Sequence, residues 1–291
     1  MKVLLWHVHG SWTHAFVQGP HDYLVVGPPE GKGLLGRDWP NAREVGLTAD
    51  RAHVAVVQEV DQLDLVPAGV PVVYLEHNTP QRPNLVHPAA GRVGLIVQVT
   101  HFNDLMWDCG TTRTTVVEHG VVDPGHRYTG ELARAAIVVN EPVRRGRVVG
   151  TDLLPRFAEV APLDVFGMGT RQLPGGLGDH DLPTLHRELA RRRVYVHPAR
   201  WTSLGLSLVE AMHLGMPVVA LACTEAVRAV PPGAGVLSTD VDELVRGVAE
   251  LVADPALARQ KGALAREFAL ERYGIDAFLG HWDRILAEVS G

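Results

Sequence analysis

The 291-residue sequence is 46% hydrophobic and 21% charged, and it carries a net charge of -6 at pH 7. This length is enough for two domains of ordinary size. The negative charge, without any block of basic residues, argues against nucleic acid or an anionic membrane as the main partner. The sequence also lacks the roughly 20 consecutive apolar residues that a membrane-spanning helix requires.

The compartment can be inferred from the cysteines and from the first residues. Cys109 and Cys223 are the only two cysteines and lie far apart in the sequence, which favours free thiols over a disulfide. The apolar run Met1–Trp6 contains a lysine and is too short for an export signal. We therefore expect a cytoplasmic protein.

The chain opens with an apolar run, Lys2–Val8, which predicts a buried strand followed by the loop His9–Trp12. Because α/β folds bind ligands in loops of this kind, Gly10 is a candidate binding residue. A second interpretation stays open: His7 and His9 would share one face of the strand, as in the His-x-His pair of amidohydrolase barrels, and could hold a metal. That metal-dependent hydrolase needs eight strand–helix units and further ligands, which the sequence does not show.

Further apolar runs predict the other strands of a first parallel sheet. These runs are Tyr23–Val26, Val54–Val57, Val70–Leu75 and Val93–Gln98. Glu76, His77 and Asn78 come directly after the third run. Side chains in this position lie where parallel sheets bind substrates, which makes His77 a candidate site residue.

The second half of the chain opens with a predicted strand, Ala136–Asn140, and a turn, Glu141–Gly150. Arg144, Arg145 and Arg147 concentrate positive charge in this turn. Such cations are suited to binding phosphate groups.

A further strand and three helices are predicted on either side of the central motif described next. Leu163–Gly169 predicts a strand and a glycine turn that contains Gly167. Val241–Ala253 and Ala256–Phe268 have the periodicity of amphipathic helices. Glu271–Val289 predicts helical structure at the end of the sequence.

The stretch Val194–Ala220 is the part of the sequence in which the predicted local structure points most clearly to a particular chemistry. It predicts a strand at Val194–His197, a loop, a helix that ends at Gly215, and a second strand at Pro217–Leu221. The unpaired amides at the start of such a helix suit an anionic group. Glu210, within the helix, could accept hydrogen bonds from a hydroxyl pair such as that of a ribose.

These residues resemble the signature P-S-R-W-E-x-F-G-L-x-x-L-E-A-M-A-x-G-x-P-V-V-A of the retaining GT-B glycosyltransferases of the group 1 family. The positions that match in register are Pro198, Arg200, Trp201, Gly205, Leu206, Leu208, Glu210, Ala211, Met212, Gly215, Pro217 and Val218 to Ala220. The family has two glutamates eight residues apart, of which the second contacts the nucleotide ribose and the first the transferred sugar. Here the second is Glu210 and the first is replaced by Thr202, which predicts a changed or weakened donor preference.

The resemblance implies an α/β fold with two Rossmann-like domains facing across a cleft. Residues 1–133 would form the acceptor-side domain and residues 134–274 the nucleotide-sugar-binding domain. A last helix, residues 275–291, would cross back to the first domain.

The resemblance also implies roles for individual residues. The residues expected to bind the donor are Gly10 and Gly167 in their glycine turns, Thr202 with the amides of Ser203, Leu204, Gly205 and Leu206 after it, and Glu210 at the ribose. His77 resembles the histidine that many family members place near the reacting sugar.

In the family, an arginine and a lysine neutralise the donor diphosphate. Matching Gly150 and Asp152 to the K-G-x-D pattern of the family places Arg144 on that arginine and leaves the lysine without a cationic counterpart. Arg145 or Arg147 could take its place, and the sequence leaves this choice open.

The predicted function is therefore the transfer of a sugar from a nucleotide diphosphate donor to an unknown hydroxyl acceptor, with retention, catalysed by His77, Arg144 and Glu210. No metal and no other cofactor is expected. The sequence leaves open whether the protein forms a homo-oligomer. One alternative is a GT-B protein that binds a nucleotide or sugar without turnover, which the missing glutamate motivates. The other is the metal-dependent hydrolase that would use His7 and His9.

Overall fold

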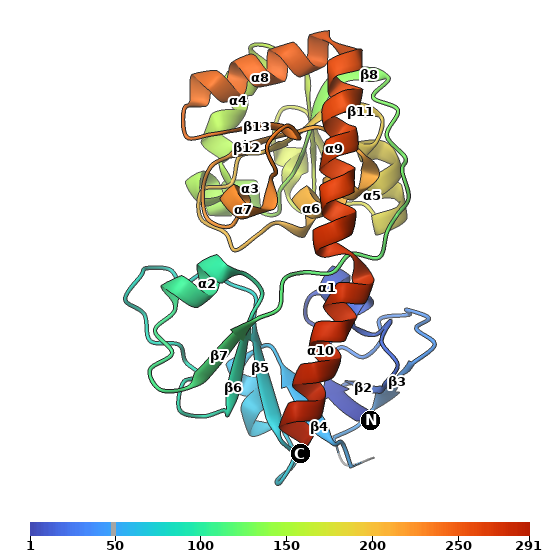
Figure 1. Ribbon diagram of the computed structural model, residues 1–291, viewed down its shortest axis with the longest axis vertical. Helices are drawn as coiled ribbons and strands as arrows, with labels where there is room; N and C mark the ends of the chain where they lie inside the picture. The colour runs from blue at the N-terminus through green and yellow to red at the C-terminus, as the bar shows by residue number, and fades with distance from the viewer. Residues whose placement is uncertain (48–50) are drawn as a thin grey trace. The chain divides into compact units, whose positions relative to one another are not determined.

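The computed structural model describes residues 1–47 and 51–291 and divides into two units. The first unit consists of Met1–Val122 and Tyr273–Gly291, and the second of Asp123–Arg272. Each unit is built on one sheet whose strands pair in parallel (Figure 1). The predicted α/β class with two Rossmann-like domains is confirmed.

The first sheet has the strand order β3-β2-β1-β4-β5-β6-β7. Its strands are β1 (Lys2–Leu5), β2 (Asp22–Val26), β3 (Ala42–Val45), β4 (Val54–Val57), β5 (Val72–Glu76), β6 (Leu95–Gln98) and β7 (Arg113–Val116). The sequence predicted a first strand that extends to Val8, but β1 ends at Leu5. It ends earlier because the Val8 amide turns back and donates to the Trp6 carbonyl at 3.1 Å. β3 was not predicted, since Val45 is its only buried residue and an apolar run is missing.

Each face of the first sheet is covered by its own apolar core. Successive side chains of a strand point to opposite faces, so Val3 and Leu5 belong to one core and Leu4 and Trp6 to the other. Two shorter helices, η1 (Val60–Asp64) and α2 (His101–Met106), also belong to this unit.

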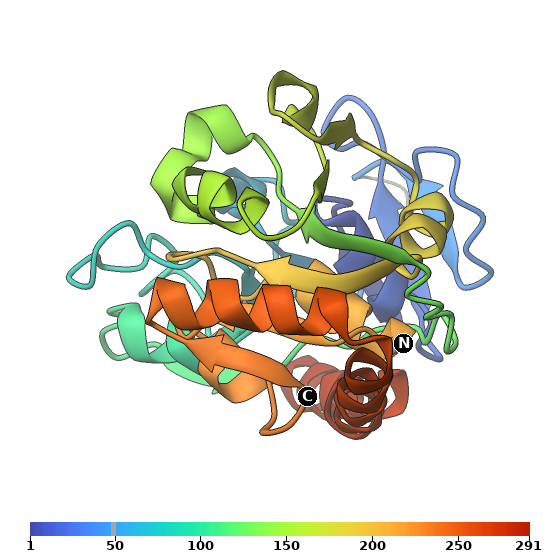
Figure 2. The same cartoon turned by 90° about the horizontal axis from the view of Figure 1, so that it is seen from above.

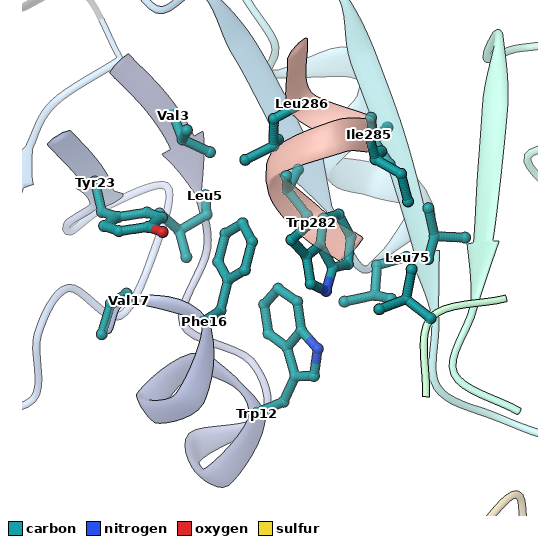
Figure 3. Close-up of a cluster of buried hydrophobic side chains, with 14 of the residues drawn as sticks. Val3, Leu5, Trp12, Phe16, Val17, Tyr23, Leu75, Trp282, Ile285 and Leu286 are labelled. Carbon is teal, nitrogen blue, oxygen red and sulfur yellow. The ribbon is translucent and has the colours of Figure 1, made fainter. Parts of the chain in front are cut away.

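Helices α1 (Gly10–Phe16) and α10 (Ile275–Ser290) supply aromatic rings to one of these cores (Figure 3). The Trp12 and Phe16 rings are 4.6 Å apart, and the Trp282 ring lies 5.6 Å from the first and 4.9 Å from the second. Such contacts add about 0.5–1.5 kcal/mol per pair beyond the burial of apolar area. The last helix of the chain is therefore an integral part of the core of the first unit.

The second sheet has the strand order β10-β9-β8-β11-β12-β13. Its strands are β8 (Leu132–Val138), β9 (Leu163–Phe166), β10 (Gly176–Gly178), β11 (Arg192–His197), β12 (Val218–Leu221) and β13 (Gly235–Ser238). The helices of this unit are α3 (Pro142–Arg145), η2 (Gly146–Val149), η3 (Thr151–Leu153), α4 (Leu154–Ala158), η4 (Thr170–Gln172), α5 (Leu182–Leu189), α6 (Leu206–Leu214), α7 (Ala226–Ala229), α8 (Val241–Ala253) and all but the last residue of α9 (Pro255–Tyr273). Helix α8 lies along one face of the sheet (Figure 2) and buries Leu244, Val248 and Leu251 at helical spacing.

The second unit begins at Asp123, earlier than the boundary that the sequence placed near Ala133. The backbone amides of Arg127 and Tyr128 both donate to the Leu214 carbonyl, at 3.2 and 3.0 Å. These bonds tie the segment before β8 to the end of α6.

Candidate functional site

Strands β8 and β11 are neighbours in the second sheet, but the chain continues from them toward opposite edges. β9 and β10 lie beyond β8, whereas β12 and β13 lie beyond β11. In open α/β sheets, a reversal of this kind marks the place, at the carboxyl ends of the two central strands, where ligands bind. The segments at this edge are residues 139–150 and 198–205, and most of the predicted donor-binding residues lie in them.

The two segments pack directly against each other. The amides of Arg200 and Trp201 donate to the Val148 carbonyl at 2.9 and 3.2 Å. Gly150 has a φ of +78°, and a Cβ atom there would lie 2.1 Å from the Pro198 carbonyl oxygen. Only glycine meets both demands at this position, so Gly150 allows the two segments to pack in direct contact.

Two of the arginines at this edge share one carboxylate. Arg200 donates to both Asp152 oxygens, at 2.5 and 3.0 Å, and Arg147 donates to the same carboxylate at 2.8 Å. The hydrogen bond from Arg200 holds the pKa of Asp152 below its usual value. Arg147 and Arg200 are therefore engaged within the protein.

Arg144 and Arg145 differ in exposure and in partners. The Arg144 side chain is 70% exposed and forms a hydrogen-bonded ion pair with Glu141. Arg145 is half-buried, and its guanidinium makes no hydrogen bond or ion pair within residues 1–47 and 51–291. Burial, and next the positive charge of Arg144, lower the pKa of Arg145. The Glu141 carboxylate opposes this with a smaller effect. Arg145 is therefore a partly buried cation that is not hydrogen-bonded to an anion in the described part of the chain.

Helix α6 points its amino end at the same edge of the sheet. Gly205 is its N-cap residue and supplies no side-chain hydrogen bond to the first turn. The first N–H groups of a helix have no partner within it and carry partial positive charge. A Cβ atom at Gly205 would lie 2.8 Å from the His197 ring, so glycine permits the close approach of β11 and the helix start.

Residues 202–204, which come before this helix, are held in place by the loop after β12. Thr202 is half-buried, whereas Ser203 and Leu204 are buried. The Thr224 hydroxyl, in the loop after β12, donates to the Ser203 carbonyl at 3.3 Å. Thr224 itself has a φ of +51°, a conformation that few non-glycine residues adopt.

Glu210 is a buried carboxylate in the second turn of α6. Its residue is 4% exposed, and its Oε2 atom lies 3.6 Å from Nε2 of His186 on helix α5. Among the described residues no donor lies within hydrogen-bond distance of this carboxylate, so it keeps accepting capacity for a ligand.

Gly167, after β9, is required by packing. It has a φ of +116°, and a Cβ atom there would lie 2.2 Å from the Val139 carbonyl oxygen. The Oδ1 atom of Asn140 accepts from the Met168 amide at 2.9 Å. The glycine that the sequence proposed for donor binding thus lets the turns after β8 and β9 meet.

His77 lies at the end of β5 in the first unit, in a cluster of imidazole rings. Its Nε2 atom donates to Oε1 of Gln58 at 2.8 Å, and its ring centre is 4.0 Å from that of His9 and 6.3 Å from that of His119. Burial, followed by the two neighbouring histidines, lowers the pKa of His77 well below its usual value. His77 is therefore neutral near pH 7, with Nδ1 left as an acceptor.

The expectation that His7 and His9 share one face of a strand is wrong. β1 ends at Leu5, and His9 already caps helix α1. His7 donates from Nδ1 to the Gly33 carbonyl at 3.1 Å, whereas the ring of His9 contacts that of His77. Within residues 1–47 and 51–291, no three His, Cys, Asp or Glu side chains are arranged to hold a metal ion.

Gly10, the first residue of α1, is exposed, and the nearest atom to a Cβ placed there would be Nε2 of His7 at 3.8 Å. The structure therefore gives no packing reason for glycine at this position.

The carboxyl edge of the second sheet thus has the uncapped start of α6 beside it, and the same helix carries the buried Glu210. Residues 171–268 match the family described as Glycosyl transferases group 1. An uncharacterized glycosyltransferase of Haemophilus influenzae is 30% identical over 97 residues, which are 32% of this chain. The aligned part is 27% of that relative. We call residues 171–268 the group 1 region.

Solved structures resemble the whole chain. Anabaena Alr3699/HepE in complex with UDP-glucose has a TM-score of 0.77 at 17% identity, covering 99% of this chain and all of that one. Sucrose-phosphate synthase from Thermosynechococcus elongatus has a TM-score of 0.72 at 14% identity, and a glycosyltransferase from Rickettsia africae 0.71 at 10%, each covering 99% of this chain and 98% of its own. At these low sequence identities, the similarities show that the fold is shared and nothing more.

The group 1 region contains the helix start at Gly205 and the carboxylate of Glu210, whereas Arg145 lies before it and His77 and Gly10 lie in the first unit. In the described part of the chain, no helix is both long and apolar enough to cross a membrane.

The sequence did not point to Gln58, His119 or His186. Each lies far in sequence from the residue that it approaches: Gln58 and His119 from His77, and His186 from Glu210. No spacing signal could have found these pairs, because separate elements bring them together.

Acid should destabilise both units. Burial lowers the pKa of His119, in the first unit, and of His197, in the group 1 region, to about 4 each. Between that value and the unfolded value near 6.5, the unfolded chain binds protons that the folded chain does not, so stability falls as the pH drops through this range. Each histidine contributes roughly 1.4 kcal/mol per pH unit there.

We therefore expect the melting temperature to fall between pH 7.5 and pH 5.5, and to fall less in His119→Gln and His197→Gln. Differential scanning calorimetry at the two pH values checks this. Equal acid sensitivity of both variants and the natural protein would contradict the assignment.

Proposed function

We propose that this protein transfers a sugar from a nucleoside diphosphate donor to a hydroxyl acceptor, with retained anomeric configuration. One observation carries the proposal: the β8/β11 edge of the second unit combines a half-buried Arg145, which forms no hydrogen bond through its guanidinium in the described part of the chain, with an uncapped helix start and a buried Glu210. A nucleoside diphosphate has the matching groups, two phosphates and a ribose. The group 1 match supports it, as does the similar fold of Anabaena Alr3699/HepE, which has been crystallised with UDP and with UDP-glucose.

In this proposal, the protein stabilises negative charge that grows on the diphosphate as the sugar leaves. Arg145 and the first amides of α6 supply positive charge that is already in place before the reaction, which is the most effective kind of stabilisation. Arg144 has a smaller part, because it is exposed and paired with Glu141. Glu210 accepts from the ribose hydroxyls, and charge-assisted bonds of this kind are the stronger ones.

Attack and departure on the same face of the sugar would let the leaving phosphate take the acceptor proton, so no strong base is needed. His77 would contribute a neutral acceptor, Nδ1, to a substrate hydroxyl. We propose that no metal is required, since arginine and amides supply the charge.

The decisive experiment incubates the purified protein with UDP-, ADP- and GDP-sugars, with and without EDTA, and measures release of the nucleoside diphosphate. One of the three diphosphates should also raise the melting temperature, because it binds the folded state. Binding without any release or transfer would favour a nucleotide-binding protein without turnover. Failure of all three to bind would refute the proposed function.

Thr202→Glu should raise kcat/KM for a hexose donor about tenfold. It restores the carboxylate that the group 1 signature has at this position, and a hydrogen bond to a charged group contributes about 1.5–3 kcal/mol. Thr202→Gln is the control, since it has the same length without the charge. Equal rates for the two variants would show that a carboxylate here does not serve the sugar.

A further inference from the structure

His186 and Glu210 form a close pair inside the second unit. Nε2 of His186 lies 3.6 Å from Oε2 of Glu210, and their side chains are 8% and 6% exposed. This Nε2 atom is buried and has no hydrogen-bond partner among the described residues. An unsatisfied buried polar group costs about 1–3 kcal/mol, so the arrangement needs an explanation.

The distance is too long for a hydrogen bond, which needs about 2.7–3.2 Å for N–H···O. A shift of the carboxylate by less than about 1 Å would complete the bond. Tyr195, whose pKa is raised first by burial and to a lesser extent by Glu210, does not compete for this bond, because its hydroxyl pairs with Ser207 at 2.9 Å.

Helix α5 holds the imidazole firmly. The Asp181 side chain caps the helix by accepting from the Thr184 amide at 2.9 Å. At the other end, Arg192 donates to the Glu188 carbonyl and to its carboxylate, both at 2.7 Å. The imidazole is therefore carried by a helix tied at both ends, and the movement that this inference requires is assigned to the Glu210 side chain.

We propose that His186 is a positioning residue for Glu210. When a ribose hydroxyl draws the carboxylate into place, Nε2–H of His186 donates to Oε2 and leaves Oε1 for the ligand. This inference rests on the proposed function, because it assumes that Glu210 binds ribose.

The test uses isothermal titration with UDP, ADP and GDP, and with the 2′,3′-dideoxy analogue of the one that binds. His186→Leu fills the site but removes the donor, whereas His186→Gln keeps an N–H at similar reach. We expect His186→Leu to weaken the ribose nucleotide about tenfold and the dideoxy analogue hardly at all, and His186→Gln to restore most of the loss. In a Glu210→Ala background, His186→Leu should have no further effect.

Equal weakening of both nucleotides by His186→Leu would show a merely structural role and overturn the inference, as would an unchanged affinity. In both cases the proposed function would stand, since the natural protein still binds the nucleotide. If the natural protein binds none of the three diphosphates, the proposed function fails and the inference falls with it.

Discussion

Arg145→Ala should lower kcat/KM for the sugar donor by about 100- to 1,000-fold, the size of effect seen when one preorganised charge-stabilising donor is removed from an active site. Arg145 is half-buried at the end of α3, and its guanidinium makes no hydrogen bond or ion pair in the described part of the chain. Burial and the neighbouring positive charge of Arg144 lower its pKa against a smaller opposing effect of Glu141, so a bound diphosphate would add negative charge that favours the charged form of Arg145.

Arg144→Ala is the matched comparison, because it removes an adjacent arginine from the same short helix. Arg144 is 70% exposed and paired with Glu141, so solvent already screens its charge. We expect less than a tenfold loss for this variant. Arg145→Lys should be intermediate, since it keeps the charge but not the planar donor geometry.

Initial rates of donor hydrolysis or transfer, with the Kd of the nucleoside diphosphate, measure these effects. If kcat/KM falls as much in Arg144→Ala as in Arg145→Ala, or more, then Arg144 and not Arg145 would be the residue that stabilises the charge of the diphosphate.

Glu210→Ala should weaken nucleoside diphosphate binding about 100-fold and lower kcat/KM by a similar factor. Glu210 is 4% exposed in α6, and each hydrogen bond from a ribose hydroxyl to its carboxylate contributes about 1.5–3 kcal/mol. Glu210→Gln keeps the shape of the side chain but removes its charge. The loss of affinity in this variant would therefore measure the contribution of the charge alone.

The control is Glu250→Gln, which removes a carboxylate exposed on α8 in the same unit and should leave binding unchanged. Isothermal titration measures the affinity of each variant for the nucleoside diphosphate and for inorganic pyrophosphate. Pyrophosphate affinity should be nearly the same in Glu210→Gln and the natural protein. Equal nucleotide affinity in Glu210→Ala and the natural protein would remove Glu210 from the site.

Several elements could be predicted because their signals are local. Helix α8 begins and ends at the predicted residues, Val241 and Ala253, since its apolar residues recur at helical spacing. Helix α6 ends at Gly215 with a φ of +90°, a conformation that glycine adopts without strain. β3 could not be predicted, because its central residues, Arg43 and Glu44, are exposed.

The sequence by itself determined the α/β class, the strand–loop–helix–strand motif and the place of Glu210 in it, because hydrophobic periodicity and glycine or proline positions act over a few residues. It could not choose among the arginines. Asp152 engages Arg200, 48 residues away, as well as Arg147, whereas the Arg145 guanidinium forms no hydrogen bond among the described residues. The pair His186 and Glu210 likewise exists only because α5 packs against α6. Charge partners and burial depend on which distant segments meet, and only the tertiary structure decides that.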